Sequence, residues 1–267
     1  MKLAALLLQL HLAFFCLGQK SSSFQLVRTY AGSITDAAID NLENVYVVSA
    51  TDQLKKFSPN GDSVAVYNNV RRFGKLTAMD VSNPLKLLLF YKDFSSIVIL
   101  DRLLAIRSSI DLRRTNMLQV TAVGLSYDNN IWLFDALENK LKKINEEGQV
   151  LLETPDLRLV FNESISPQQI IDRNKQVHLY DSTKGLYVFD QYGTFKRKMP
   201  LSGWENISVT EKQILGTSNN ALQVYQPSTL MHTHQPLPPH FSSYYRYFLS
   251  HNKLLALSPK GLFIYGF

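Results

Sequence analysis

Short runs of apolar residues, each four to seven residues long, alternate along this chain with polar turns that contain Asp, Asn or Gly. Aromatic and β-branched residues predominate in the runs, as is typical of short antiparallel strands joined by hairpins. Three stretches repeat the same order of apolar run, Asp or Asn turn, second run, polar turn, third run and glycine turn. These stretches are residues 34–61, 120–148 and 165–193.

Three weaker copies of the pattern fill the remaining chain, at residues 76–100, 207–225 and 247–265. The third run of the successive copies starts at residues 54, 97, 141, 186, 222 and 262, at intervals of 36 to 45 residues. Four short strands in about forty residues, repeated around an axis, are typical of a β-propeller. The sequence therefore predicts an all-β, six-bladed propeller with four-stranded antiparallel blades, formed as a single domain by residues 19–267.

The two ends of the repeat array predict how the ring closes. The last copy stops at Phe267 just after its third strand, whereas residues 24–30 form an additional strand before the first copy. Pairing this N-terminal strand with the last blade would complete that blade and cover its open edge. We therefore expect the N-terminal strand to close the ring.

At these residues the chain resembles the NHL-type six-bladed propellers. The first copy carries the pattern in Ile39-Asp40, the run 44–47 (Asn-Val-Tyr-Val), Leu54, Phe57 and Gly61. The copies at 120–148 and 165–193 follow it closely, and the other three depart from it. The Trp-Asp pairs of the common seven-bladed family are absent, since Leu133 follows Trp132 and Glu205 follows Trp204. The resemblance implies that the Asp after the second strand stabilises its blade. In this chain Asp135 and Asp181 occupy that position.

Residues 1–18 have the features of a secretory signal peptide, with Lys2 before an apolar run at 3–15 and cleavage expected before Gln19. This run is shorter than the ~20 residues that a spanning helix needs, and no later run is long enough. Lipid attachment at Cys16 is the alternative, but Phe15 is bulky where the lipoprotein peptidase requires a small residue. We expect an exported, bacterial protein that is periplasmic, secreted or associated with the outer membrane.

Composition and charge narrow the function further. Cys16 is the only cysteine, so cleavage of the leader would exclude disulfides, a thiolate zinc site and a cysteine nucleophile. The formal net charge of +6 comes from short basic runs spread along the chain. We interpret these runs as solvated loops and strand edges, with weak attraction to anionic glycans. Export argues against a nucleic acid as partner.

The candidates for chemistry favour structural roles. Asp135 and Asp181 occupy equivalent places after a second strand, where an Asp can cap the following turn through its backbone. Small hydroxyl residues recur near the start of each innermost strand and would line a polar channel; they are Thr35, Thr77, Thr121, Ser166 and Ser208. His232 and His234 have a workable metal-ligand spacing, but the prolines that follow indicate an exposed loop. No nucleophile elbow, phosphate loop or HExxH helix is present, so we predict no catalytic residue, metal or cofactor.

The leading hypothesis is a non-catalytic binding or scaffold protein, monomeric or part of a complex, that recognises an envelope protein or a glycan. In a propeller, the loops from outermost to innermost strands and from second to third strands share one face, and such loops carry function. The candidate contact residues in them are Arg71, Arg72, Tyr91, Lys92, Arg113, Arg114, Asp135, Asp181 and Trp204. One alternative is a hydrolase or lyase that acts on a polysaccharide or lactone through the central channel. For this alternative the early strands supply only the acids Asp36, Asp40 and Asp80, and no later copy supplies a matching set. Another is a purely structural envelope component.

Overall fold

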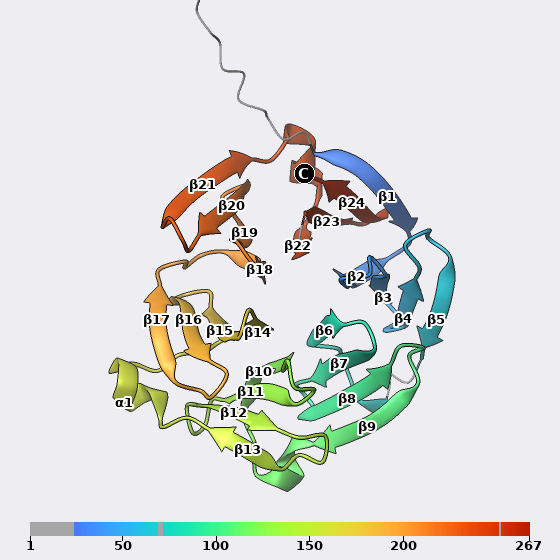
Figure 1. The fold of residues 1–267 in the computed structure, drawn as a ribbon. Coiled ribbons are helices and arrows are strands. Elements are labelled where there is room, and N and C mark those ends of the chain that lie inside the picture. Colours follow the sequence, from blue (N-terminus) through green and yellow to red (C-terminus); the bar gives the residue numbers. More distant parts are fainter. Residues whose placement is uncertain (1–23, 69–71, 251) are drawn as a thin grey trace, which may run out of the picture.

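The computed structural model describes residues 24–68, 72–250 and 252–267, and within these ranges six four-stranded antiparallel sheets are arranged around a common axis (Figure 1). Blade 1 comprises β2 (Ile34–Ile39), β3 (Val45–Ser49), β4 (Leu54–Phe57) and β5 (Ser63–Tyr67). Blade 2 comprises β6 (Ala78–Asn83), β7 (Lys86–Tyr91), β8 (Ser96–Asp101) and β9 (Ile106–Asp111). Blade 3 comprises β10 (Val120–Leu125), β11 (Ile131–Asp135), β12 (Lys140–Ile144) and β13 (Val150–Glu153).

The remaining blades follow the same order from the axis outward. Blade 4 comprises β14 (Gln169–Arg173), β15 (Gln176–Asp181), β16 (Gly185–Asp190) and β17 (Phe195–Met199). Blade 5 comprises β18 (Glu205–Val209), β19 (Ile214–Ser218), β20 (Ala221–Gln226) and β21 (Met231–Pro236), and blade 6 contains β22 (Arg246–Ser250), β23 (Lys253–Ser258) and β24 (Gly261–Gly266). Helix α1 (Leu157–Phe161) and two short 3-10 turns, Leu112–Thr115 and Pro239–Ser243, lie in the connections. The predicted propeller is confirmed, and each predicted third strand starts within one residue of its observed position.

The fourth strand of blade 6 is β1 (Gln25–Ala31), from the opposite end of the described chain. It pairs antiparallel with β24, in a register that runs from Gln25 opposite Gly266 to Ala31 opposite Gly261. The Phe24 ring adds contacts to Phe241 and Phe267, with centroid distances of 5.3 and 5.7 Å. The prediction that the N-terminal strand closes the ring is confirmed. The predicted leader lies outside the described residues.

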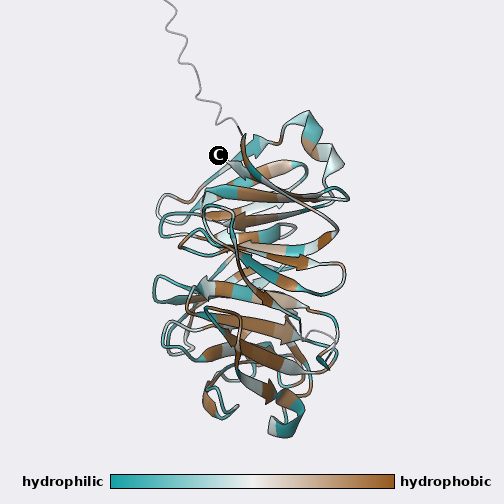
Figure 2. Ribbon diagram, turned by 90° about the vertical axis from the view of Figure 1, so that its right-hand side faces the viewer, coloured by the Kyte–Doolittle hydropathy of each residue, from teal (hydrophilic) through white to brown (hydrophobic). Residues whose placement is uncertain are grey.

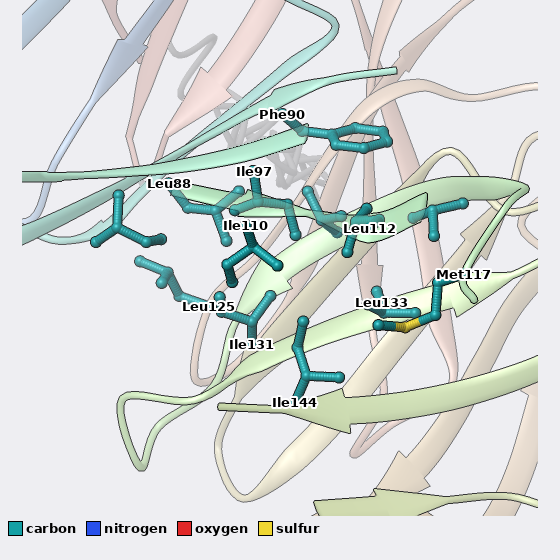
Figure 3. Close-up of a cluster of buried hydrophobic side chains, with 13 residues drawn as sticks. Leu88, Phe90, Ile97, Ile110, Leu112, Met117, Leu125, Ile131, Leu133 and Ile144 are labelled. Carbon is teal, nitrogen blue, oxygen red and sulfur yellow. The ribbon is translucent and has the colours of Figure 1, made fainter. Parts of the chain in front are cut away.

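The apolar core is divided among the six interfaces between neighbouring blades. One cluster of buried hydrophobic residues lies at each interface, for example between β7–β9 of blade 2 and β10–β12 of blade 3 (Figure 3). Alternate residues of each strand face opposite neighbours, so Leu88 and Phe90 contribute to this cluster while Leu87 and Leu89 contribute to the one shared with blade 1. The hydrophobic positions accordingly concentrate in the strands, and the hydrophilic ones in the loops on either side (Figure 2).

The two sides of the ring carry different loops. One face carries the connections from outermost to innermost strands and the hairpins between second and third strands, and we call it the upper face. We call the opposite side the lower face. Polar side chains join neighbouring blades on the lower face. The Asp172 carboxylate of blade 4 accepts hydrogen bonds from blade 3, and the Lys86 ammonium of blade 2 pairs with Glu146 of blade 3 at 2.7 Å.

Candidate functional site

Four of the predicted contact residues are exposed on the upper face of blade 2 or in its connections to its neighbours: Arg72, Lys92, Arg113 and Arg114. The Arg72 guanidinium lies 5.3 Å from the centre of the Phe73 ring. Arg113 and Arg114 flank Asp111, at 3.1 and 3.8 Å from its carboxylate oxygens. Arg71 lies outside the described residues.

Tyr91 and Trp204 are buried, so they lie in the core and not on the partner surface predicted for them. Tyr91 is the last residue of β7 and follows the alternation of Leu87 and Leu89 into the interface with blade 1. The Trp204 ring covers the backbone of Gly216, where a Cβ atom would lie 2.5 Å from the ring. The alternation of side chains between the two faces of each strand, which is visible in the sequence, already indicated that Tyr91 is buried.

Asp135 and Asp181 are buried at the ends of β11 and β15, where they hold the hairpins that follow. Asp135 Oδ1 accepts from the Leu137 amide at 3.1 Å, and Asp181 Oδ1 accepts from the Thr183 amide at 2.9 Å. Their second oxygens accept from the Lys142 ammonium at 2.9 Å and the Ser166 amide at 2.7 Å, respectively. These contacts confirm the turn-capping interpretation and leave neither carboxylate exposed to a partner.

The sequence-based prediction missed large apolar side chains that are exposed on the same face. Phe94, Leu118, Leu137 and Leu159 have exposed fractions of 46, 55, 50 and 80%. All four lie in connections and not in strands. A large apolar residue in a predicted loop is the sequence signal that could have identified them. We call the upper-face surface formed by both groups the blade 2–3 rim: Arg72, Lys92, Phe94, Arg113, Arg114, Leu118, Leu137 and Leu159.

Backbone contacts show that the segments of the rim from Lys92 to Leu159 are adjacent. The Leu112 amide donates to the Ser95 carbonyl, and the Ala136 amide donates to the Gln119 carbonyl, both at 2.8 Å. The Leu157 amide likewise joins helix α1 to the blade 3 hairpin at Asn139, at 2.9 Å. The rim therefore combines four cationic and four apolar side chains on neighbouring loops, a composition that suits protein recognition.

A central cavity of about 730 Å³ follows the propeller axis, lined mainly by the six innermost strands. Thr77, Thr121 and Ser208 line it, as the repeated hydroxyl pattern predicted. A smaller cavity of about 390 Å³ opens beside it between blades 1 and 2, and Thr35 and Thr77 line this side pocket. Ser166 lines neither cavity, and its amide donates to Asp181 Oδ2 at 2.7 Å. Asp36, Thr77, Lys92 and Arg246 line both cavities.

Asp36 is the acidic residue among the four that line both cavities. Its Oδ2 lies 3.9 Å from Arg246 Nη1, and its side chain is only 17% exposed. Burial raises the pKa of the Asp36 carboxyl to about 6, because the attraction of Arg246 only partly offsets the loss of hydration. Asp36 therefore carries a charge at neutral pH that the protein incompletely compensates.

This raised pKa predicts a pH-dependent effect of Asp36→Asn. The folded state binds the Asp36 proton more tightly than the unfolded state does, so wild-type stability falls as the pH rises from about 4 to about 6. The variant lacks this loss and should exceed the wild type by about 2–3 kcal/mol at pH 7.5, with little difference at pH 4. Urea unfolding at both pH values measures the two differences. An equal difference at both pH values would contradict the assignment.

The histidines are dispersed in the described structure. His232 and His234 lie on the outermost strand β21, which continues through Pro236, so part of the segment predicted as a loop is a strand. His232 Nε2 lies 2.9 Å from Gln223 Oε1. His178 is buried, and burial lowers its pKa to about 4.

Within the described ranges, no three His, Cys, Asp or Glu side chains group as metal ligands. None of the helices in these ranges has the length and apolarity to cross a membrane.

Known structures resemble this fold at low sequence identity. Virginiamycin B lyase from Staphylococcus aureus is 13% identical with a TM-score of 0.60, covering 92% of this chain and 89% of its own. The Pan2 WD40 domain from Neurospora crassa is 12% identical with a TM-score of 0.61, covering 89 and 80%. BamB from Moraxella catarrhalis is 13% identical with a TM-score of 0.51, covering 88 and 84%. No sequence-family profile and no curated protein sequence matches the chain. These similarities concern the propeller fold alone.

Proposed function

We propose that this protein is an exported, non-catalytic binding module that recognises a protein of the cell envelope through the blade 2–3 rim. The observation that carries the proposal is the composition of the rim, which combines exposed arginines and a lysine with the exposed apolar residues Phe94, Leu118 and Leu137. Arginine and aromatic side chains dominate the energetics of protein interfaces. A partner would bury the exposed apolar side chains, and the cations would favour a partner that carries acidic groups.

The rigidity of the propeller supports this assignment. The rim loops join strands whose side chains form the buried interface between blades 2 and 3, so the loops are held on a packed scaffold. A preorganised surface loses little conformational entropy when a partner binds. Export through a leader at residues 1–18 and membership of the NHL-type propellers are parts of the same proposal, supported by the apolar leader and by the repeat pattern.

Charge reversal of the rim is the first test. The triple variant Arg72→Glu, Arg113→Glu and Arg114→Glu should reduce partner binding at least tenfold, because it places three acidic groups among the remaining apolar contacts. The matched control reverses three exposed cations elsewhere, Lys175, Arg197 and Lys212. A photo-crosslinking residue at Leu118 should trap an envelope protein in living cells, and this adduct should disappear with the triple variant.

A second crosslinking position controls for nonspecific capture. Leu103 lies in a lower-face loop of blade 2 and is 58% exposed, close to the 55% of Leu118. Crosslinking from Leu103 should give no discrete adduct. The proposal is wrong if both positions trap the same proteins, or if the triple variant keeps the adduct while unfolding at the wild-type temperature.

The enzymatic alternative has one observation in its favour. The Asp36 carboxyl, with its pKa raised to about 6, lies at the mouth of the central cavity and could act as a general base near neutral pH. Among the described residues, however, the lining of both cavities contains no histidine or cysteine that could act with it. Hydrolysis or elimination of a polysaccharide or lactone that is lost in Asp36→Asn would favour the alternative.

A further inference from the structure

The side pocket between blades 1 and 2 brings together charged residues from three blades. Blade 1 and its hairpin contribute Asp36 and Asp52, and the segments that flank β6 and β7 contribute Lys75, Lys92 and Asp93. Arg246 reaches in from β22 of blade 6. Three cations and three acids thus line a cavity of about 390 Å³, which lies within the size range of small-molecule sites.

Four of these six charged groups form no ion pair with another described residue. In the described part of the chain, no ion pair within 4.0 Å involves Asp52, Lys75, Lys92 or Asp93. Asp36 and Arg246 are 3.9 Å apart, which is too long for a hydrogen bond. Lys75, Lys92 and Asp93 are exposed to solvent, whereas Asp36 and Asp52 are partly buried. A ligand that carries complementary charges can pair with both the acids and the cations of this pocket.

Two of the groups are held in place by their surroundings. Arg246 Nη1 donates to the Thr35 carbonyl at 3.1 Å, and the guanidinium lies 4.6 Å from the centre of the Phe248 ring. The Lys92 backbone amide donates to Thr77 Oγ1 at 3.0 Å, which fixes the start of its hairpin against the pocket wall. The Arg246 guanidinium and the Lys92 backbone are therefore held in place, with Asp36 and Arg246 at the boundary with the central cavity.

We propose that this side pocket binds a small zwitterion carrying one ammonium and one carboxylate group, of the size of an amino acid or a dipeptide. Asp36 and Asp52 would receive the ammonium, and Lys75 and Lys92 would receive the carboxylate. A simple anion would satisfy the lysines and leave the acids unpaired, and a simple cation would do the reverse. A ligand ammonium would also supply the compensation that Arg246 gives only partly to Asp36, whose pKa burial raises.

The test uses L-alanyl-L-alanine and L-alanine as probes, followed by ¹H–¹⁵N NMR of the full domain. At least one probe should cause saturable shifts at residues 35–36, 75–77, 92–93 and 246. N-acetylation of that probe removes its ammonium and amidation removes its carboxylate, and each change should weaken binding at least tenfold. Asp36→Asn and Lys75→Gln should weaken it to a similar extent, whereas Lys212→Gln on the lower face should leave it unchanged.

The zwitterion site and the partner surface share Lys92 but can be tested independently through their other residues. Lys75 and Asp36 are not part of the blade 2–3 rim, so their variants should keep the envelope partner. The charge-reversed rim variant should in turn keep zwitterion binding, because its three positions lie outside the side pocket. The inference is overturned if neither probe gives saturable shifts, if the blocked derivatives bind as tightly as the free probe, or if Asp36→Asn retains full affinity while folded.

Discussion

Deletion of residues 24–30 is expected to abolish cooperative unfolding of the domain. The deletion removes nearly all of β1, which exposes the paired edge of β24 and opens the ring between its first and last blades. Tyr30 also packs on the Phe57 ring of blade 1 at a centroid distance of 4.6 Å, so the interface between blades 6 and 1 loses contacts as well. Thermal and urea unfolding, followed by near-UV circular dichroism, should show no cooperative transition.

A point variant tests the same closure without shortening the chain. Gly261 pairs with Ala31 at φ +144°, and a Cβ atom there would lie 2.1 Å from the Tyr30 carbonyl oxygen. Gly261→Ala should therefore destabilise the domain by about 2–4 kcal/mol. Leu26→Ala, at a position on β1 that is 55% exposed, should change stability by less than about 0.5 kcal/mol.

A variant lacking residues 24–30 that melts like the wild type would refute ring closure as the source of stability.

Asp172→Ala is expected to destabilise the protein by about 3–5 kcal/mol. Asp172 Oδ2 accepts hydrogen bonds from three groups of blade 3: Ser126 Oγ at 3.0 Å, the Tyr127 amide at 3.2 Å and Trp132 Nε1 at 3.0 Å. Trp132 is fully buried, so the substitution leaves its indole N–H without an acceptor in the core. Urea unfolding at neutral pH measures the loss.

The matched substitutions separate this contact from a general effect of removing an acid. Asp172→Asn keeps an acceptor oxygen and should lose less stability than Asp172→Ala. Asp62→Ala removes an exposed carboxylate that accepts a hydrogen bond from Ser58 Oγ at 3.4 Å, and it should cost less than about 0.5 kcal/mol. Equal losses for Asp172→Ala and Asp62→Ala would show that the link between blades 3 and 4 contributes little.

The candidate surface was only partly predictable from the sequence. Arg72, Lys92, Arg113 and Arg114 are exposed as expected, because charged side chains in loops rarely find compensation inside a core. Tyr91 and Trp204 were assigned to the same surface but are buried. Tyr91 ends β7 and continues the alternation of its apolar residues, whereas the loop position of Trp204 does not show which way its side chain points. Phe94, Leu118 and Leu137 were missed, because exposure of an apolar residue depends on which segments pack around it.

The sequence by itself determined the number of blades, the order of strands and the closure by the N-terminal strand. Periodic apolar runs and hairpin turns are local properties that repeat along the chain, so they can be read without coordinates. Only the tertiary structure decided that Asp36, Lys75 and Arg246 share a pocket. These residues come from blade 1, from the connection to blade 2 and from blade 6, and the packing that brings them together depends on long-range contacts for which the repeat pattern contains no signal.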